Sequence, residues 1–369
     1  MKRFLAFVLA FLMLFACSCS QGDSNKEVTD SDIKALVAIF EEKLSSGELE
    51  AEFTGDYSTE AMKLAFGEFL ADHPEIFWFN GGFSCEKSGF GDGTKIVFKP
   101  YSVGDTESNL KKQSELFEAL NKLCEGAKSY DTDFEKIKYI YDEIAKNTRY
   151  DSMTAYYIEL GEETTTVYSA SGSYGCLVEK LAVCSGYSAV FQLAARKLGY
   201  EVNRISGIAN SQYHQWNQIC VDGQWYNIDV TWGDVEDPET RAIIGDVSYG
   251  YFMCTDSEFT QHHKADEDQK PEKCTSDKFD YYTNINAYVE KYDYDTVAEI
   301  IKNQIDSNGI RAEVKFSSVE ECQKALDDLI TAGKIFDVHS AYSVGAVHYT
   351  TGGELVLGIA AMDASVLGD

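Results

Sequence analysis

The stretch from Gly175 to Trp232 constrains the fold of this chain more than any other. Cys184 lies at the head of a run, Ser188 to Leu198, in which apolar residues recur at helical spacing: Val190, Leu193, Ala194 and Leu198. Gly199 ends this predicted helix, as a glycine just past the last turn commonly does. A cysteine at a helix N-terminus feels the positive end of the helix dipole, which favours the thiolate. The pattern therefore makes Cys184 a candidate nucleophile.

Two predicted strands follow the helix and are joined by a tight turn. They run from Gln212 to Val221 and from Gln224 to Trp232, and the dipeptide Asp222-Gly223 between them is typical of a type I′ hairpin. His214 precedes this turn by eight residues and Asp229 follows it by six. Because the two positions fall nearly opposite each other, contact between the two side chains is expected.

Cys184, His214 and Asp229 fit one catalytic arrangement. The cysteine would attack, the histidine would take its proton, and the aspartate would orient the imidazole and stabilise its charged form. Each residue alone also has a structural explanation: a cysteine opening an apolar helix is usually a small core residue, and a strand histidine or strand-ending aspartate is often only hydrogen-bonded. The order of the three and the hairpin between two of them favour the triad.

These motifs resemble the bacterial transglutaminase-like superfamily over roughly residues 131–264. The matching positions are Cys184, Gly186, Tyr187, His214, Trp216, Asn217, Asp229, Val230, Thr231 and Trp232. The resemblance implies an α+β, papain-like core, in which the helix carrying Cys184 packs on an antiparallel sheet carrying His214 and Asp229. It implies a triad that needs no cofactor and no metal. The backbone N–H of Cys184 is expected in the oxyanion hole, whereas the glutamine of papain-type enzymes has no clear counterpart, so the second donor stays open.

The first nineteen residues predict a targeting segment. Lys2 and Arg3 supply a positive start, and an apolar run from Phe4 to Phe15 follows. The sequence around Cys17 resembles a bacterial lipoprotein cleavage site, with Cys19 as a second possible frame. We therefore expect an exported protein held by a lipid on Cys17 at the extracytoplasmic face of the membrane; an ordinary secretory peptide is the alternative.

The acidic composition excludes one class of partner. The formal charge is −29, and it becomes more negative when Lys2 and Arg3 leave with the targeting segment. A chain with this charge and no long basic cluster is repelled by nucleic-acid phosphates. The expected partners are a protein or peptide substrate, possibly a cell-wall peptide, and the membrane through the lipid anchor.

The organisation predicted from the sequence has four parts: a targeting segment over 1–19, an N-terminal α+β region over 20–130, a catalytic domain over 131–265 and a small C-terminal α+β module over 280–369. Helices are expected over 31–45, 59–71, 103–123 (on the surface) and 134–148. Residues 150–175, rich in Ser, Thr, Tyr and Gly, are expected to form a long loop that lines the substrate groove, with a disordered insertion as the alternative. The scattered cysteines outside the leader are expected to be mostly buried free thiols.

Three functions remain open from the sequence. The first is an acyltransferase that resolves a thioester with an amine, as a transglutaminase does. The second is a cysteine peptidase or amidase acting on peptide or cell-wall substrates with the same triad. The third is a binding module for the cell envelope in which the triad is silent, and the intact Cys184, His214 and Asp229 argue against it.

Overall fold

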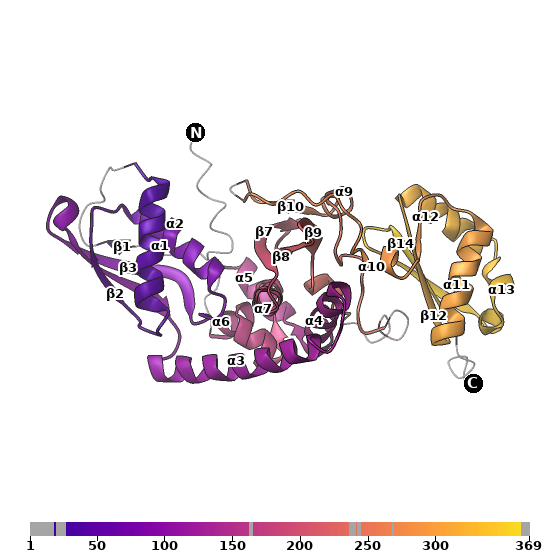
Figure 1. Ribbon diagram of the computed structural model, residues 1–369, viewed down its shortest axis with the longest axis horizontal. Coiled ribbons are helices and arrows are strands. Elements are labelled where there is room, and N and C mark those ends of the chain that lie inside the picture. Colours follow the sequence, from indigo (N-terminus) through magenta and orange to yellow (C-terminus); the bar gives the residue numbers. More distant parts are fainter. Residues whose placement is uncertain are drawn as a thin grey trace.

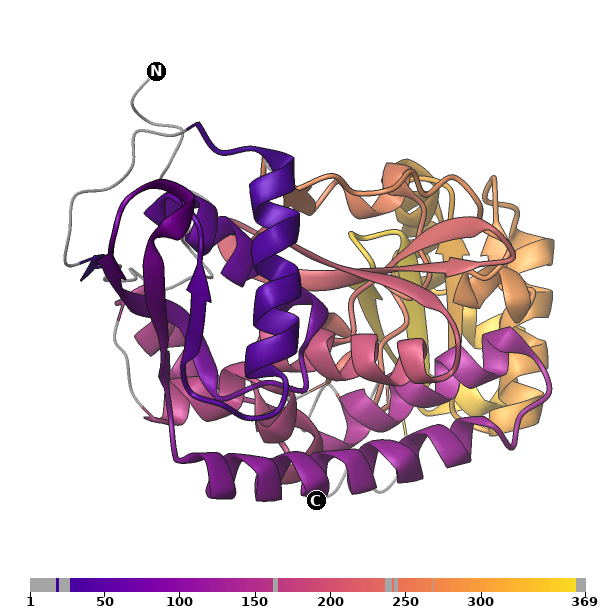
Figure 2. The same ribbon diagram turned by 60° about the vertical axis from the view of Figure 1, so that its left-hand side comes forward.

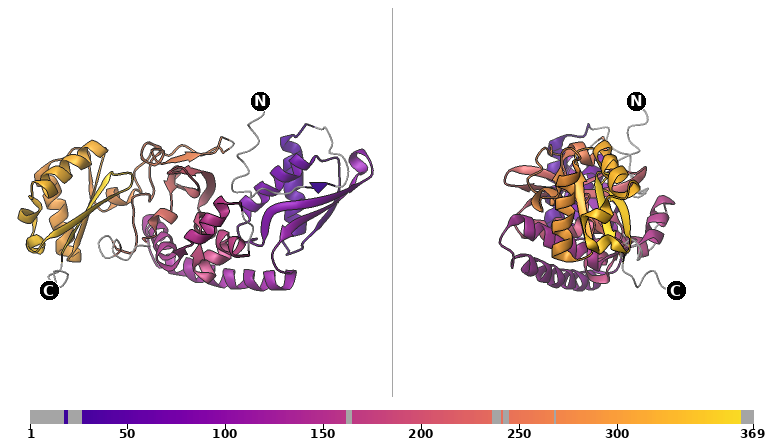
Figure 3. Two further views of the ribbon diagram at one scale, coloured as in Figure 1. Left: turned by 180° about the vertical axis from the view of Figure 1, so that it is seen from behind. Right: turned by 90° about the vertical axis from the view of Figure 1, so that its right-hand side faces the viewer.

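The computed structural model describes residues 18–19, 27–161, 165–235, 241, 245–267 and 269–362. Within these residues, three α+β units lie in a row, each with a four-stranded sheet and a hydrophobic core (Figure 1). Figure 3 shows the same row from behind and along its long axis. We call them the N-terminal unit (α1 to β4), the central unit (α3 to β10) and the C-terminal unit (α10 to β14). The α+β class predicted from the sequence is confirmed.

The N-terminal unit packs two helices on a sheet of strand order β1-β3-β4-β2. Its elements are α1 (Asp30–Leu44), β2 (Ala51–Thr54), α2 (Thr59–Asp72), β3 (Phe79–Ser88), β4 (Lys95–Ser102) and the two-residue β1 (Ser18–Cys19). Both helices start where the sequence predicts, because Thr29 and Ser58 cap them with side-chain oxygens. Phenylalanines from both helices and both long strands fill the core: Phe40, Phe66, Phe69, Phe83 and Phe98.

The long helix α3 (Thr106–Ala127) leads from the N-terminal unit along the central unit (Figure 2). The predicted surface helix is present, and in its second half one face, with Leu116, Leu120 and Cys124, is buried in the central core. These positions have helical spacing. Because the first half of α3 is mostly polar and exposed, the apolar stripe covers only part of the helix and is weak when the whole segment is considered.

The central unit places helix α7 against a sheet of order β10-β7-β8-β9, with antiparallel pairing throughout. Its strands are β7 (Glu201–Ala209), β8 (Gln212–Val221), β9 (Gln224–Ile228) and β10 (His263–Ala265), with the small pair β5 (Arg149–Tyr150) and β6 (Leu181–Ala182). Its helices are α4 (Asp133–Asn147), α5 (Ser152–Glu159), α6 (Thr165–Ser171), α7 (Cys184–Lys197) and α9 (Asp256–Phe259).

The expectation of a long loop over residues 150–175 is wrong. Helices α5 and α6 lie in it, and a π-helical turn over Gly175–Glu179 follows. Asp151 starts α5 by accepting hydrogen bonds from the backbone N–H and the hydroxyl of Thr154. Met153, Tyr156 and Leu160 recur at helical spacing in and just after α5 but are exposed, and a helix this short depends on its tertiary setting.

The C-terminal unit has strand order β11-β12-β14-β13. Its elements are α10 (Tyr281–Asn284), β11 (Tyr288–Val289), α11 (Tyr294–Asn308), β12 (Arg311–Phe316), α12 (Val319–Leu326), α13 (Ile335–Val338), β13 (Ala346–Thr351) and β14 (Val356–Ala361). It meets the central unit closely: a Cβ atom on Gly250 would lie 2.6 Å from the backbone nitrogen of Gly352. The domain boundaries given above stay a prediction.

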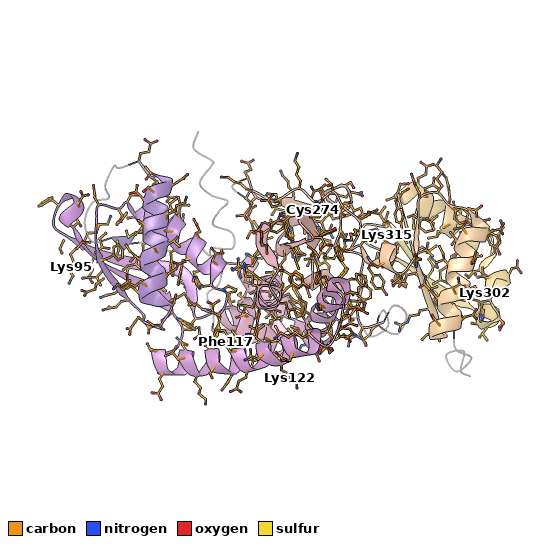
Figure 4. The ribbon with its side chains drawn as sticks, in the orientation of Figure 1. Lys95, Phe117, Lys122, Cys274, Lys302 and Lys315 are labelled. Atoms are coloured by element: carbon orange, nitrogen blue, oxygen red, sulfur yellow. The ribbon has the colours of Figure 1, made fainter. Side chains whose placement is uncertain are left out.

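Buried charges join the C-terminal and central units. Lys315 of β12, labelled at this junction in Figure 4, is 2% exposed. Its Nζ lies 2.7 Å from Asp280 Oδ2 and 2.9 Å from Glu258 Oε1. Burial alone would lower the pKa of Lys315, but Cys254, Asp280 and Glu258 raise it above the ordinary value, so the ammonium stays charged.

The cysteines agree with the expectation in most cases. The free thiols are Cys124, Cys176, Cys184, Cys220, Cys254, Cys274 and Cys322, and all but Cys220 are buried. Cys85 departs from it, because it is disulfide-bonded. Among the described residues no helix combines the length and the apolar character needed to cross a membrane.

Candidate active site

Helix α7 begins at Cys184, and its first turn is built for close approach. A Cβ on Gly186 would lie 2.8 Å from the Cβ of Ala182 and 2.9 Å from the carbonyl oxygen of Ala170. Only glycine therefore lets the helix N-terminus settle against these segments. Val183, at the N-cap position, gives no side-chain hydrogen bond to the helix. This leaves the first backbone N–H groups of α7 without a side-chain cap.

The predicted hairpin is present between β8 and β9. Asp222 and Gly223 both have positive φ, 52° and 73°, as a type I′ turn requires. The second strand is shorter than predicted, because β9 ends at Ile228 and the chain turns at Asp229. Asp229 Oδ1 accepts hydrogen bonds from the backbone N–H groups of Thr231 at 3.0 Å and Trp232 at 3.3 Å, which stabilise this turn.

The structure brings Cys184, His214 and Asp229 together. His214 Nε2 lies 2.6 Å from Asp229 Oδ2, and the side chain of Cys184 acts on the same ring from the N-terminus of α7, raising the pKa of His214. All three residues are buried, Asp229 completely. The histidine thus lies between a thiol and a carboxylate, in the order that the sequence analysis predicts.

The electrostatics of the site favour a charged imidazole. Burial alone would lower the pKa of His214, but the charge and hydrogen bond of Asp229, with a smaller effect from Cys184, raise it to about 10. Burial would raise the pKa of Asp229, but His214 and His263 hold it well below its usual range. The pair is therefore imidazolium and carboxylate at neutral pH.

A second histidine, His263, contacts the carboxylate of Asp229, although no site role was expected for it from the sequence. Its Nε2 is 3.0 Å from Asp229 Oδ2, and its side chain is fully buried on β10. Burial lowers the pKa of His263, so this ring is a neutral donor. The neighbouring pair His262-His263 carries no spacing signal towards Asp229, because the contact arises only when β10 pairs with β7.

Backbone contacts also fix Asp229 in place. Its N–H donates to the carbonyl oxygen of Tyr251 at 3.0 Å, and its carbonyl oxygen accepts from the Tyr141 hydroxyl at 3.2 Å. Tyr141 comes from α4 and Tyr251 from the segment before α9. The backbone of Asp229 is therefore held by two separate segments of the central unit.

Two tryptophans flank the histidines. Trp216 is buried on β8, and Trp232 is partly buried with its ring centroid 5.4 Å from that of His214 and 4.4 Å from that of His263. Both pack beside the triad, as the sequence analysis expects. Aromatic walls keep water away from the His214–Asp229 pair and so strengthen their interaction.

In the part of the chain that the structure describes, two groups of side chains are close enough together to be considered as metal ligands. One is His214, Asp229 and His263, whose ligand atoms lie within 4.8 Å of one another. In this group the carboxylate oxygen is already engaged by both rings at hydrogen-bonding distance. The other is Cys254, Glu258 and Asp280, where the Lys315 ammonium lies against both carboxylates and supplies the positive charge.

The raised pKa of His214 makes stability depend on pH. An unfolded histidine titrates near 6.5, so the stabilisation by the His214–Asp229 pair is complete below that pH and is lost as the pH rises towards about 10. We expect the urea midpoint to fall between pH 6.5 and 9.5 more steeply in the wild type than in His214→Asn. His348→Asn, at an exposed position, should keep the wild-type slope. Equal slopes in the wild type and His214→Asn would contradict the charged pair.

The predicted lipid anchor Cys17 lies outside the described residues. Cys19 is in β1, which pairs in parallel with Ser84 and Cys85 of β3. Cys17 as the lipid-modified residue therefore remains a prediction from the sequence.

Comparison with protein families identifies one part of the chain. Residues 121–230 match the family model of the transglutaminase-like superfamily, so the predicted resemblance is confirmed for this segment, which carries Cys184, His214 and Asp229. None of the curated proteins matches the chain.

Solved structures cover part of the chain. They include a TGase crystal structure (18% identity, 42% of this chain and 46% of that one, TM-score 0.31), a "putative cysteine protease" from Cytophaga hutchinsonii (17%, 40% and 62%, 0.24) and a "putative protease" from Parabacteroides distasonis (12%, 40% and 39%, 0.22). The chain spans less than two thirds of the length of each of them.

Proposed function

We propose that this chain, transglutaminase-like over residues 121–230, is a cysteine-dependent acyl-transfer enzyme that acts on a carboxamide or peptide carbonyl through a thioester. The observation that supports the proposal most strongly is the position of His214 between Cys184 and Asp229. Covalent acyl transfer requires this arrangement: a nucleophile, a base beside it and a third group that orients the base.

In the first half-reaction, Sγ of Cys184 attacks the carbonyl carbon and a carbon–sulfur bond forms. An imidazolium at His214 keeps a negative sulfur favourable before the attack. When the tetrahedral intermediate collapses, the carbon–nitrogen bond breaks and the imidazolium gives its proton to the leaving amine. Asp229 keeps the ring in orientation through its Oδ2 contact.

The N-terminus of α7 supplies the stabilisation of the oxyanion in this proposal. Cys184 is the first residue of α7, where no carbonyl within the helix accepts its backbone N–H, so this group can donate to the negative oxygen. The helix dipole acts in the same direction.

In the second half-reaction, an amine or water attacks the thioester while neutral His214 takes its proton. Attack by an amine gives transfer and attack by water gives hydrolysis, and the triad is the same for both. Cysteine peptidase or amidase activity on a peptide or cell-wall substrate is therefore the second candidate. A silent binding module would need no buried imidazole held between a thiol and a carboxylate.

Replacement of the nucleophile tests the proposal. We expect Cys184→Ala to lose activity by about 10⁴-fold or more, since losing one member of such a unit removes most of its effect. The readouts are incorporation of monodansylcadaverine into dimethylated casein and release of peptides from the same protein. Cys220→Ala, a partly exposed free cysteine on β8, should keep full activity. Equal activity in Cys184→Ala and the wild type would contradict the proposal.

We also propose export and lipid anchoring through Cys17, on the strength of the positive start and apolar run of residues 1–19. Mass spectrometry of the membrane-bound protein tests this, because a diacylglyceryl group on an N-terminal Cys17 is expected. A mature chain that starts elsewhere and lacks lipid would contradict it.

A further inference from the structure

A cavity of about 500 Å³ lies between the N-terminal and central units, and none of the three triad residues is part of its lining. Helix α2 and the segment before β3 form one wall, and residues of α7, β7 and β8 form the other. Ser185 and Gln215, which follow Cys184 and His214 in the chain, both line it. A cavity of this size accommodates a small organic molecule or a few residues of a peptide. It therefore lies where part of a substrate of the proposed site could bind.

Arg204 of β7 brings a positive charge to this cavity. Its Nη2 donates to the carbonyl oxygen of Leu70 at 3.1 Å. No ion pair joins it to a carboxylate of the described residues; Asp72 and Glu75 act on it only at longer range. Burial lowers the pKa of Arg204 to about 10, so the guanidinium remains charged at neutral pH. A guanidinium presents five N–H donors, and a carboxylate is the partner that fits two of them at once.

Arg196 shows by contrast how an arginine in this region can be satisfied. It bridges the same two units, with Nη2 3.0 Å from Asp72 Oδ1 and Nη1 2.9 Å from the Asp72 carbonyl oxygen. Arg196 does not line the cavity. An arginine can therefore bridge the two units while paired with a carboxylate, and the lack of such a partner is specific to Arg204.

Two hydroxyl groups at the cavity also lack partners. Ser185 is 4% exposed, and its Oγ makes no hydrogen bond to the described residues; the same holds for the buried Oγ of Ser171. Both residues line the cavity. Both Oγ atoms are themselves buried, so their side chains would have to rotate towards the cavity before a polar ligand could bond to them.

The rest of the lining limits what that ligand can be. Leu70, Ile76 and Phe77 add apolar surface, which suits an aliphatic or aromatic side chain. Lys63 and His73 line the cavity as well as Arg204, and Glu68 and Asp266 line it too, so its charges are mixed. A ligand with one carboxylate on an apolar body matches this distribution better than a highly charged anion such as a phosphate.

We infer that this cavity is a substrate subsite that binds a free carboxylate of a short peptide, with Arg204 as its anchor and the side chain beside the carboxylate on the apolar wall. The role as a subsite rests on the proposed function, whereas the binding of carboxylates does not. Its position next to Ser185 and Gln215 would place the carboxylate within a few residues of the carbonyl that Cys184 attacks.

Affinity selection with two peptide pools tests the inference. The full chain carrying Cys184→Ala, which cannot turn the peptides over, is incubated with a randomised N-acetyl tetrapeptide mixture and with the same mixture as C-terminal amides. Retained peptides are measured by mass spectrometry. We expect the free acids to be retained at least tenfold more than the amides, with an apolar preference at the last residue. Arg204→Met should abolish the difference, and Arg196→Met should keep it.

A second variant covers the case in which Arg204→Met does not fold. Leu64→Trp, on the α2 wall, leaves Arg204 in place but fills the cavity, and it should also lower the retention of the acids at least tenfold. Equal retention of acids and amides, retention of neither, or a preference for acids that survives both variants would overturn the inference. If the free acids are selected but Cys184 of the wild type is unreactive, the proposed function is wrong and the cavity is a carboxylate-binding site without that role. If Cys184 is reactive but the free acids are not preferred over the amides, only the inference of the subsite is wrong.

Discussion

Asp229→Asn is expected to lower kcat/KM on the order of 10⁴-fold, as an amide in place of the third member of a triad does elsewhere. Asp229 Oδ2 accepts from two histidine rings at once, His214 at 2.6 Å and His263 at 3.0 Å. An amide nitrogen at this position cannot accept from either ring. The pKa of His214 would fall, and the imidazole would lose its orientation towards Cys184.

Asp222→Asn is the matched control for this change. Asp222 is an exposed carboxylate in the β8–β9 turn, where it pairs with Lys278. Asparagine tolerates its positive φ. The control should keep wild-type activity in the same casein assays. Asp229→Asn with more than a tenth of wild-type kcat/KM would show that Asp229 does not support His214 in catalysis.

Lys315→Met is expected to destabilise the fold by about 3–5 kcal/mol, because it leaves two carboxylates at a buried site without their cation. Asp280 is 2% exposed and Glu258 is mostly buried, and both lie within 3 Å of Lys315 Nζ. Since Glu258 belongs to the central unit and Lys315 to the C-terminal unit, the variant should also loosen the contact between them. Urea unfolding followed by circular dichroism measures the change.

Lys324→Met provides the comparison on the surface. Lys324 pairs with Glu320 at 2.9 Å and Glu321 at 2.7 Å, but its side chain is 49% exposed. Such a pair contributes about 0–1 kcal/mol. Similar losses for the two variants would show that the Lys315 contacts are not the buried link that the distances indicate.

The central helix and hairpin could be predicted from the sequence because their signals are local. Gly199 and the apolar spacing define the end of α7, and Asp222-Gly223 fixes the register that brings His214 near Asp229. The family resemblance added the α+β core around them. One local signal was misread: β9 ends at Ile228, because Asp229 uses its own side chain to turn the chain.

What could not be predicted depends on contacts between distant segments. His263 reaches Asp229 only through the β10–β7 pairing, 34 residues further along the chain. The short helices α5 and α6 have too few turns to be predicted from their own residues, and the burial of α3 depends on a core formed by later elements. The same holds for Lys315, whose partner Glu258 lies in the preceding unit.

The alkylation rate of Cys184 by iodoacetamide as a function of pH, in the wild type and in His214→Ala, tests the central claim most directly. A free cysteine becomes reactive only as the pH approaches about 8.5. If His214 and Cys184 work as a pair, the wild-type residue keeps reacting at pH 6, and His214→Ala loses this reaction while still reacting at pH 9. A rate that rises only near pH 8.5 or above in both proteins would contradict the account and leave the fold with a binding role.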